Sequence, residues 1–396
     1  MSAQSKQLSW ALLESARGIG VERGVDLVLH ALFVRWLATQ SAGQARWHEL
    51  VTSANDEELV ERFNHLDIFR EQSSDVYLDA EAYRSTLRSL VEIIDQSIPT
   101  TGPVDAQRDE IADTFDETLG HLSRLGKQSG ESDTPRDVAR LMVALTVRPG
   151  DRVLDPACGN GTGLLLAAKA QPDVSVSGFD INSRVARRAS MRLIVHGVET
   201  GTGFGAWAGD AFTEYAPGDS DVVIAQPPWN VTFAEHQRET IRRLAGVFPD
   251  LSQKTLPKGD MPWLLLALDA LARDGRAALV LSGSSVQHRY RDIHEHLLRR
   301  GAVEAIIALP AGIFRHTSIS TGLWLLREPT THNVSDSVLM IDPQTLAEAT
   351  ARDQVHLGDE GVQAIANIVA DYRSTGAVSA PSHIARAVVV TELHLD

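Results

Sequence analysis

The chain has 396 residues, of which 43% are hydrophobic, 6% aromatic and 22% charged, as is typical of a folded protein of two or three domains. Its 37 Lys and Arg residues and 52 Asp and Glu residues give a net charge of −15. This charge argues against a chain that binds nucleic acid without a partner. A single cysteine, Cys158, excludes an intrachain disulfide framework, and neither a signal peptide nor an apolar run of roughly 18 residues is present, so we expect a cytoplasmic protein with no membrane partner.

Residues 1–125 are predicted to form an N-terminal helical domain. Apolar residues recur there at helical spacing, for example Leu8, Leu12 and Ala16. Residues 1–130 contain 12 basic and 21 acidic residues. This negative charge fits either solvated helix faces or a docking surface for a basic partner subunit.

A polar linker follows at 126–133, and a helix is predicted after it. Thr134 is a suitable N-cap, Pro135 suits the first helical position, and Asp137 stands where a capping box places its acid. We assign residues 126–345 to a catalytic domain and residues 346–396 to a C-terminal helical tail.

Within 126–345, short apolar runs alternate with helical patterns, which indicates a mostly parallel, doubly wound α/β sheet. Because the last two runs are joined by only 12 residues, they are predicted to form an antiparallel pair at the sheet edge. The predicted strands are Arg152–Pro156, Val174–Phe179, Asp221–Ala225, Ala277–Ser282, Ala305–Leu309 and Gly322–Leu326. The predicted helices between them include Arg184–Ile194, Trp263–Ala272 and Tyr290–Arg299.

A glycine-rich turn, Asp155-Pro-Ala-Cys-Gly-Asn-Gly-Thr-Gly163, follows the first of these strands. Glycine lets a ligand approach the backbone, and the next helix offers its free N–H groups. The dinucleotide fingerprint would require a third glycine at position 164, which is leucine here. The acid ahead of the glycines suits a cationic or zwitterionic ligand better than a pyrophosphate.

Two further acids follow the next strands. Asp180 lies 21 residues after Gly159, where a doubly wound nucleotide site places the acid that binds a ribose. Asp210 is placed to accept a hydrogen bond from an adenine amino group. In this order after the glycine turn, they favour a nucleoside site over strand-end caps.

The tetrapeptide Gln226-Pro-Pro-Trp229 comes directly after the apolar strand 221–225. Two prolines cannot continue a strand ladder, so they form a rigid turn at the edge where α/β sheets bind ligands. An amide before them and an aromatic ring after them favour a catalytic turn over a simple strand stop.

Together these segments resemble the amino-group methyltransferases that use S-adenosylmethionine, and specifically the methylation subunits of type I restriction-modification systems, which methylate adenine N6 in DNA. The similarity extends from 130–136 through both motifs to 274–281 and Ile307–Phe314, and Ser318–Thr321 continues it. It implies a class I, Rossmann-like methyltransferase fold behind an N-terminal helical domain. No metal is expected, because His288, His294 and His296 lack the zinc spacing.

The resemblance also implies roles for individual residues. The target base would be held by Gln226, Pro227, Pro228 and Trp229. The cofactor S-adenosylmethionine would contact Glu131, Ser132, Asp133, Thr134, Pro135, Arg136, Asp155, Ala157, Gly159, Asn160, Gly161, Thr162, Asp180, Ile181, Asn182, Asp210, Ala211 and Phe212. The implied partners are DNA, a specificity subunit that selects the target sequence, and a restriction subunit.

The sequence departs from the family at two places. Gln226 stands where the family has Asn, which moves the side-chain carbonyl by about 1.5 Å, one carbon–carbon bond. Ser132 and Asp133 replace aromatic residues beside the cofactor. The alternatives to an active adenine methylase are a cofactor-binding scaffold without catalysis, and a methylase of RNA or of a protein glutamine.

Two arginine groups on predicted helices have open roles. Arg184, Arg188 and Arg192 share one helix face, and a solvated face is favoured over a phosphate contact for them. The second group, for which a role on the DNA backbone is as well supported as a solvated face, comprises Arg238, Arg242 and Arg243.

Overall fold

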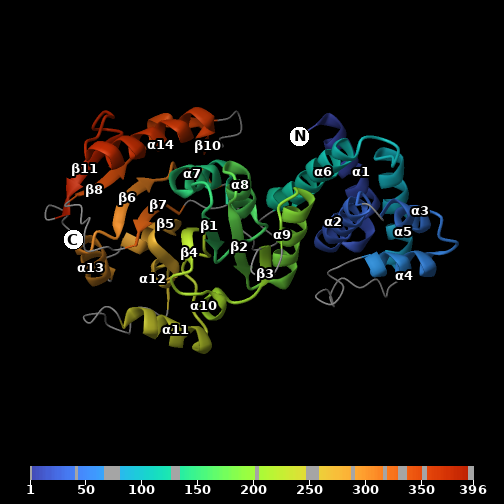
Figure 1. The fold of residues 1–396 in the computed structure, drawn as a ribbon, viewed down its shortest axis with the longest axis horizontal. Coiled ribbons are helices and arrows are strands. Elements are labelled where there is room, and N and C mark those ends of the chain that lie inside the picture. Colours follow the sequence, from blue (N-terminus) through green and yellow to red (C-terminus); the bar gives the residue numbers. More distant parts are fainter. Residues whose placement is uncertain are drawn as a thin grey trace. The chain divides into compact units, whose positions relative to one another are not determined.

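The structure is a computed structural model of the whole chain. It describes residues 2–40, 43–66, 81–125, 134–200, 205–246, 258–286, 290–314, 319–328, 337–349 and 355–390. The backbone forms two compact units (Figure 1). The helical unit comprises Met1–Ser132 and Asn182–Ala208, and the sheet unit comprises Asp133–Ile181 and Gly209–Asp396. The division into domains at 125 and 345 stays a prediction.

The helical unit confirms the helical character predicted for the first 125 residues. Its helices are α1 (Ala3–Ser15), α2 (Val21–Leu37), α3 (Gly43–Val51), α4 (Asp56–Leu66), α5 (Glu81–Ser97), α6 (Val104–Leu125) and α9 (Ser183–Val195), with the 3₁₀ turn Arg17–Ile19 and strand β3 (Gly205–Ala208). Leu29, Phe33 and Phe115 are fully buried in its core, which also includes Met191 and Val195 of α9. Burial of apolar helix faces, and of α2 on all sides over residues 24–35, therefore stabilises this unit.

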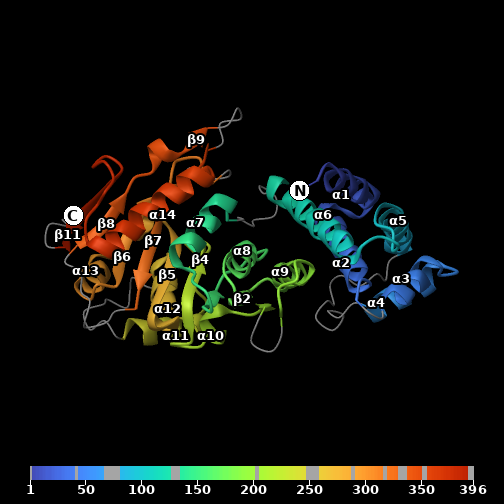
Figure 2. The same cartoon turned by 45° about the horizontal axis from the view of Figure 1, so that its top comes forward.

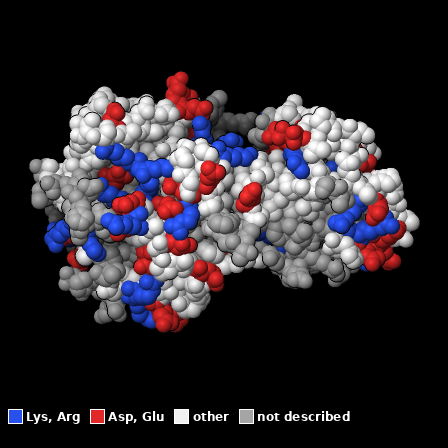
Figure 3. Space-filling model, in the orientation of Figure 1, with Lys and Arg blue, Asp and Glu red and all other residues white. Residues whose placement is uncertain are grey.

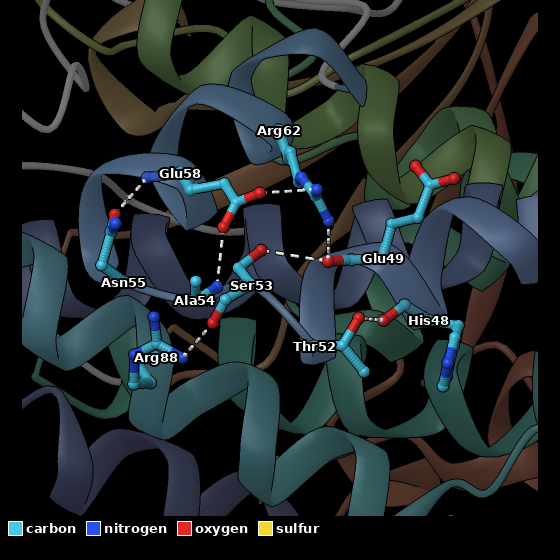
Figure 4. Close-up of polar contacts among 9 residues, drawn as sticks. All are labelled: His48, Glu49, Thr52, Ser53, Ala54, Asn55, Glu58, Arg62 and Arg88. Atoms are coloured by element: carbon cyan, nitrogen blue, oxygen red, sulfur yellow. Dashed lines mark hydrogen bonds and ion pairs between the residues drawn. The ribbon is translucent and has the colours of Figure 1, made fainter.

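Short-range polar contacts fix the turn between α3 and α4 (Figure 4). The Asn55 side chain accepts from the backbone N–H of Glu58 at 2.9 Å, and the Glu58 carboxylate accepts from the backbone N–H of Ala54 at 2.7 Å. The first bond satisfies an N–H group that the first turn of α4 leaves without a helical partner, and the second ties the residue before the N-cap to that turn. Arg62, one turn later, binds the same carboxylate at 2.6 Å and thereby orients it.

The arginines of α9 do not form a solvated face, which corrects the interpretation favoured from their spacing. The Arg188 Nε lies 2.7 Å from Asp26 Oδ1 of α2, and both side chains are almost completely buried, at 2% and 3% exposure. Arg184 reaches the same carboxylate at 3.3 Å, and Arg192 binds Asp116 of α6 at 2.7 Å. Helical spacing correctly placed the three arginines on one face, but that face packs against acidic residues of α2 and α6.

We expect Asp26→Ala to lower the free energy of unfolding by about 3–5 kcal/mol, because it removes the carboxylate that pairs with the buried Arg188 guanidinium at 2.7 Å. Urea unfolding followed by circular dichroism measures the loss. Glu14→Ala is the matched control, since Glu14 pairs with Arg17 at 3.2 Å on an exposed surface and is expected to cost under about 1 kcal/mol. Equal losses in the two variants would contradict the prediction.

The sheet unit contains the strands that carry the predicted motifs. Their order is β11-β8-β6-β7-β5-β4-β1-β2. The strands are β1 (Arg152–Asp155), β2 (Ser175–Asp180), β4 (Ser220–Ala225), β5 (Leu271–Ser282), β6 (Val303–Ala308), β7 (Thr321–Arg327), β8 (Ser337–Ile341) and β11 (Ala385–Val389). Strands β2, β1, β4 and β5 are parallel, so their carboxyl ends meet at one edge of the sheet.

Helices cover both faces of this sheet (Figures 1 and 2). Helix α7 packs between α8 and α14 on one face, and α11 packs between α10 and α12 on the other, where α12 and α13 share a core with the strands. The helices are α7 (Arg136–Thr146), α8 (Thr162–Ala170), α10 (Ala211–Glu214), α11 (Glu235–Ala245), α12 (Met261–Ala270), α13 (Arg291–Arg299) and α14 (Gly358–Thr375). The doubly wound, mostly parallel α/β fold is confirmed.

Three details differ from the sequence expectations. The pair β6–β7 is antiparallel as predicted but is not at the edge, because β8 and β11 extend the sheet beyond β6. The segment 346–396, expected to be helical, contains α14, the strand β11 and the short strands β9 (Glu348–Ala349) and β10 (Val355–His356). Helix α7 begins one residue later than expected, with Pro135 at the N-cap position and no side-chain cap. The carboxylate of Asp137 instead accepts from the backbone of Leu357 and Gly358 at the start of α14, at 3.1 and 3.2 Å.

Among the described residues, none of the helices combines the length and the apolar character that crossing a lipid bilayer requires.

Candidate functional site

The glycine-rich turn connects the carboxyl end of β1 to α8. Gly161 is the N-cap of α8 and has a left-handed backbone (φ 73°), which glycine adopts without strain. A Cβ at Gly163 would lie 2.9 Å from Ile224 Cδ1 and 3.3 Å from Asp155 Oδ2, so only glycine lets the helix pack this closely on β4. A Cβ at Gly159 would meet nothing within 4 Å. The turn is therefore tightly packed at Gly163, where it meets β4, and open at Gly159.

The first acid, Asp155, ends β1 and is buried. One of its oxygens accepts the Ala157 N–H at 3.1 Å. The pKa of Asp155 is raised to about 7: burial is the main cause, the Ala157 N–H opposes it, and the charge of Asp180 adds to it. Asp155 can therefore change its charge near neutral pH.

The second acid, Asp180, ends β2 and ties the glycine turn to that strand. Its Oδ2 accepts from the Gly159 N–H at 3.2 Å, and the Cys158 N–H donates to the Phe179 carbonyl at 2.9 Å. Cys158 is buried as predicted for a small packed residue, and burial raises the pKa of its thiol well above the usual value. The structure thus brings Asp155, Asp180 and the turn together at one edge.

The third acid, Asp210, caps α10 by accepting from the Phe212 N–H at 3.0 Å. Its second oxygen lies 2.9 Å from Nε2 of His236 on α11, a contact that the sequence pattern did not indicate. Ala211 and Phe212 are buried, and the Phe212 ring packs edge-on against Trp263 at 4.8 Å. The Phe212 side chain therefore belongs to the core, and its backbone N–H and carbonyl are bound to Asp210 and Thr240.

The other predicted cofactor residues lie in varied surroundings. Ile181 is 74% exposed, an unusual state for a large apolar side chain directly after Asp180. Asn182 caps α9 in the helical unit by accepting from the Arg184 N–H at 3.1 Å. Asn160 is buried, Thr162 begins α8, and Thr134, Pro135 and Arg136 lead into α7. Glu131, Ser132 and Asp133 lie outside the described residues.

Gln226 directly follows β4 and is 8% exposed. Its side-chain oxygen, Oε1, is buried and has no hydrogen-bond partner within the described ranges. Leaving such an acceptor unsatisfied costs about 1–3 kcal/mol. The fold therefore holds a side-chain carbonyl ready to accept a hydrogen bond at the same edge as Asp155 and Asp180.

Trp229, three residues after Gln226, is held in place by two contacts. Its Nε1 donates to the Val280 carbonyl of β5 at 3.1 Å, and its ring meets Phe314 edge-on at 5.1 Å. Pro227 is buried and Pro228 exposed, as suits a rigid turn that leaves the sheet. The motif thus presents an amide and an indole from a braced loop.

Sequence reasoning missed the residues that brace the loop. Asp260 accepts from the Asn230 N–H at 2.9 Å and from the Ser282 hydroxyl at 2.6 Å, and Ser284 binds the Asn230 side chain at 2.9 Å. One indirect signal is visible in the sequence: Asp260 precedes an apolar helix with proline near its start, which suggests a cap. That pattern says nothing of the contact with Asn230.

The arginines after the motif pair with acids of the sheet unit. Arg238 and Arg242 bind Glu235 at 2.9 and 2.8 Å, and Arg243 binds Asp269 at 3.1 Å. They also keep partly exposed side chains, so the choice between a solvated face and a DNA contact stays open. Figure 3 shows basic and acidic residues interspersed over the visible face of the sheet unit. No group of three or more potential metal ligands occurs among the described residues.

The chain matches a known protein family. The family model described as N-6 DNA Methylase matches residues 106–393, so the chain belongs to this family. It is 26% identical over 275 residues to the type I restriction enzyme MjaVII methylase subunit of Methanocaldococcus jannaschii, covering 66% of this chain and 47% of that protein. It is 28% identical over 231 residues to the HindI methylase subunit of Haemophilus influenzae, covering 52% and 50%. The chain thus spans about half the length of the curated relatives it matches.

A solved structure supports the fold over the full length. The methyltransferase subunit of a type I restriction-modification system from Streptococcus thermophilus superposes with a TM-score of 0.79 at 20% identity, covering 99% of this chain and 97% of that one. At 20% identity this similarity establishes the fold.

Proposed function

We propose that this chain transfers a methyl group from S-adenosylmethionine to adenine N6 in DNA, as the methylation subunit of a type I-like restriction-modification system. The observation that carries the proposal is the buried, unpaired Oε1 of Gln226, held on a diproline turn at the carboxyl edge of the sheet. Family membership and the named methylase relatives support it.

The residues at the edge fit the cofactor. The open space at Gly159 leaves room for a ligand against the backbone, and Asp155 and Asp180 supply negative charge for a cationic molecule. The exposed Ile181 would offer an apolar surface to the adenine ring of the cofactor, and the Asp210 carboxylate, which also contacts His236, would accept from the amino group of that ring. When bound, S-adenosylmethionine supplies an electrophilic methyl group on a sulfonium. The other predicted cofactor residues keep that role as part of this proposal.

The chain's own residues position the target amine. An adenine extruded from the duplex stacks on Trp229, whose ring is fixed by Val280 and Phe314. Gln226 Oε1 accepts one N6 hydrogen and the Pro227 carbonyl accepts the other, which directs the nitrogen lone pair outward. Positioning and dipole stabilisation then provide the rate gain, and no covalent enzyme intermediate is needed.

The partners follow from the charge. A net charge of −15 does not favour unaided DNA binding, so we propose that a specificity subunit supplies target recognition and that a restriction subunit joins the same complex. The single cysteine fits a reducing compartment, the cytoplasm.

The experiment incubates the chain, alone and with the protein of a neighbouring gene, with methyl-labelled S-adenosylmethionine and mixed-sequence DNA. We expect N6-methyladenine in the presence of the partner. Absence of label in both conditions would contradict the proposal. Label in RNA or protein but not in DNA would show that the chain methylates another substrate.

A second candidate is a cofactor-binding scaffold without methylation. The glutamine at position 226, where the family has asparagine, is the observation that favours it. Binding of S-adenosylmethionine by calorimetry is common to both functions, so activity of Gln226 variants has to separate them.

A further inference from the structure

Asp260 is a completely buried carboxylate next to the segment that follows the Gln226–Trp229 turn. One oxygen accepts from the Asn230 backbone N–H at 2.9 Å. The other accepts from the backbone N–H and the hydroxyl of Ser282, at 2.8 and 2.6 Å. Three donors from two separate segments therefore converge on one carboxylate, and such charge-assisted bonds are stronger than neutral ones.

The position of Asp260 in the chain does not account for these bonds. Asp260 stands at the N-cap of α12, yet its side chain makes no capping bond. A capping side chain accepts from N–H groups of its own helix, whereas this one points to the end of β5 and to the loop after β4. Its helix thus gives up a cap that typically contributes ~1 kcal/mol.

The residue that Asp260 holds is conformationally unusual. Asn230 has a left-handed backbone (φ 56°) and directly follows Trp229. Its side chain accepts from the Ser284 hydroxyl at 2.9 Å, and Ser284 in turn contacts the Ser282 hydroxyl at 2.6 Å. Asn230 is therefore fixed through both its backbone and its side chain to the end of β5.

A second connection runs alongside the first. The Gly259 N–H donates to the Val231 carbonyl at 3.0 Å, and Thr232 forms an antiparallel bridge with Lys258. The segment before Asp260 is thus paired with the segment after Asn230. The exit of the Gln226–Trp229 turn is tied to α12 and β5 by bonds that involve none of the proposed substrate-binding atoms.

We propose that Asp260 is a positioning residue for methyl transfer, and that its carboxylate sets the direction of the Gln226–Trp229 turn through Asn230 and Ser282. This inference rests on the proposed function, since it concerns the same base-binding loop. Asp260 touches neither base nor cofactor. Its loss shifts the Gln226 carbonyl and the Trp229 ring relative to the bound methyl donor, and a displacement near 1 Å costs on the order of 100-fold in rate.

The test compares Asp260→Asn with Asp269→Asn, a matched change on the same helix. Asp269 accepts from the Tyr215 hydroxyl at 2.6 Å, pairs with Arg243 at 3.1 Å and lies outside the loop network, so kcat is compared at saturating DNA, where a change in DNA affinity through Arg243 does not enter. With mixed-sequence DNA and the partner subunit, we expect Asp260→Asn to lower kcat about 100-fold with the Kd of S-adenosylmethionine within twofold of the unchanged protein. Asp269→Asn is expected to leave kcat within about twofold.

Hydrogen exchange provides a readout that does not depend on activity. We expect the Asn230 amide to exchange at least tenfold faster in Asp260→Asn, with core amides of α12 such as Leu265 unchanged. If Asp260→Asn does not fold, Ser282→Ala removes one donor, keeps the charge, and is expected to lower kcat about tenfold.

The outcomes separate this inference from the proposed function. An active parent protein whose kcat is unchanged in Asp260→Asn would overturn the positioning role. Absence of N6-methyladenine with the parent protein would instead refute the proposed function, and unchanged Asn230 exchange would then refute the positioning role separately.

Discussion

Replacing Gln226 with alanine is expected to lower the methylation rate by about two to three orders of magnitude, with the affinity for S-adenosylmethionine unchanged within twofold. The reason is that Oε1 of Gln226 is a buried acceptor with no partner among the described residues, which in the proposed function binds the N6 amine, and removing one such preorganised group costs about 10²–10³ in rate. Single-turnover transfer of labelled methyl to DNA measures the rate, and calorimetry measures cofactor binding.

Gln226→Asn provides the matched comparison. We expect Gln226→Asn to methylate on the order of 100-fold more slowly than the parent protein. The loop is adapted to glutamine, and shortening the side chain by one methylene withdraws its carbonyl by about 1.5 Å. A silent parent protein that gains activity as Gln226→Asn would indicate a disabled methylase, and silence in both would support the scaffold.

The affinity for S-adenosylmethionine is expected to fall about tenfold when the pH is lowered from 8 to 6. Burial raises the pKa of Asp155 to about 7 from an ordinary value of 3.8. Below pH 7 the carboxylate is protonated and no longer attracts a cationic ligand. For a pKa of 7, the ionised fraction changes from about 10/11 at pH 8 to about 1/11 at pH 6. Calorimetry across this range measures the change, with proton release on binding below pH 7.

Asp155→Asn is the control for this titration. We expect it to bind at least tenfold more weakly at pH 8 and to lose the pH dependence, because the amide carries no charge at either pH. A Kd of the parent protein that is constant from pH 6 to 8 would contradict the role of Asp155.

The same group affects stability with the opposite sign. Because the folded pKa of Asp155 lies above its unfolded value, the unfolded chain releases this proton first as the pH rises. The contribution of Asp155 to stability is therefore complete below about pH 4 and is lost as the pH approaches 7. Cofactor binding is expected to compensate for this loss at neutral pH.

Much of the fold could be predicted because buried parallel strands have continuous apolar sequences. The run that became β4 is of this kind, whereas β2 alternates buried and half-buried residues, and the ends of β1, β2 and β4 place Asp155, Asp180 and Gln226 at one edge. Strand β11 was missed because it is a peripheral strand, largely exposed, and shows no apolar alternation.

Partners distant in sequence could not be predicted. Spacing showed that Arg184, Arg188 and Arg192 share a face but gave no indication of Asp26, more than 150 residues earlier. The bond between Asp260 and Asn230 likewise depends on how α12 and the loop after β4 meet in space. Such contacts are set by tertiary packing, which local patterns do not encode.

The helical unit is assembled from two stretches of chain, and this affects the order in which the protein can mature on the ribosome. Its core includes Met191 and Val195, and the carboxylate of Asp26 is neutralised by Arg188. A nascent chain that has emerged only as far as residue 132 lacks these groups, so helices α1 to α6 would expose an apolar surface and the Asp26 charge without Arg188. Synthesis must pass residue 208 before this unit can close.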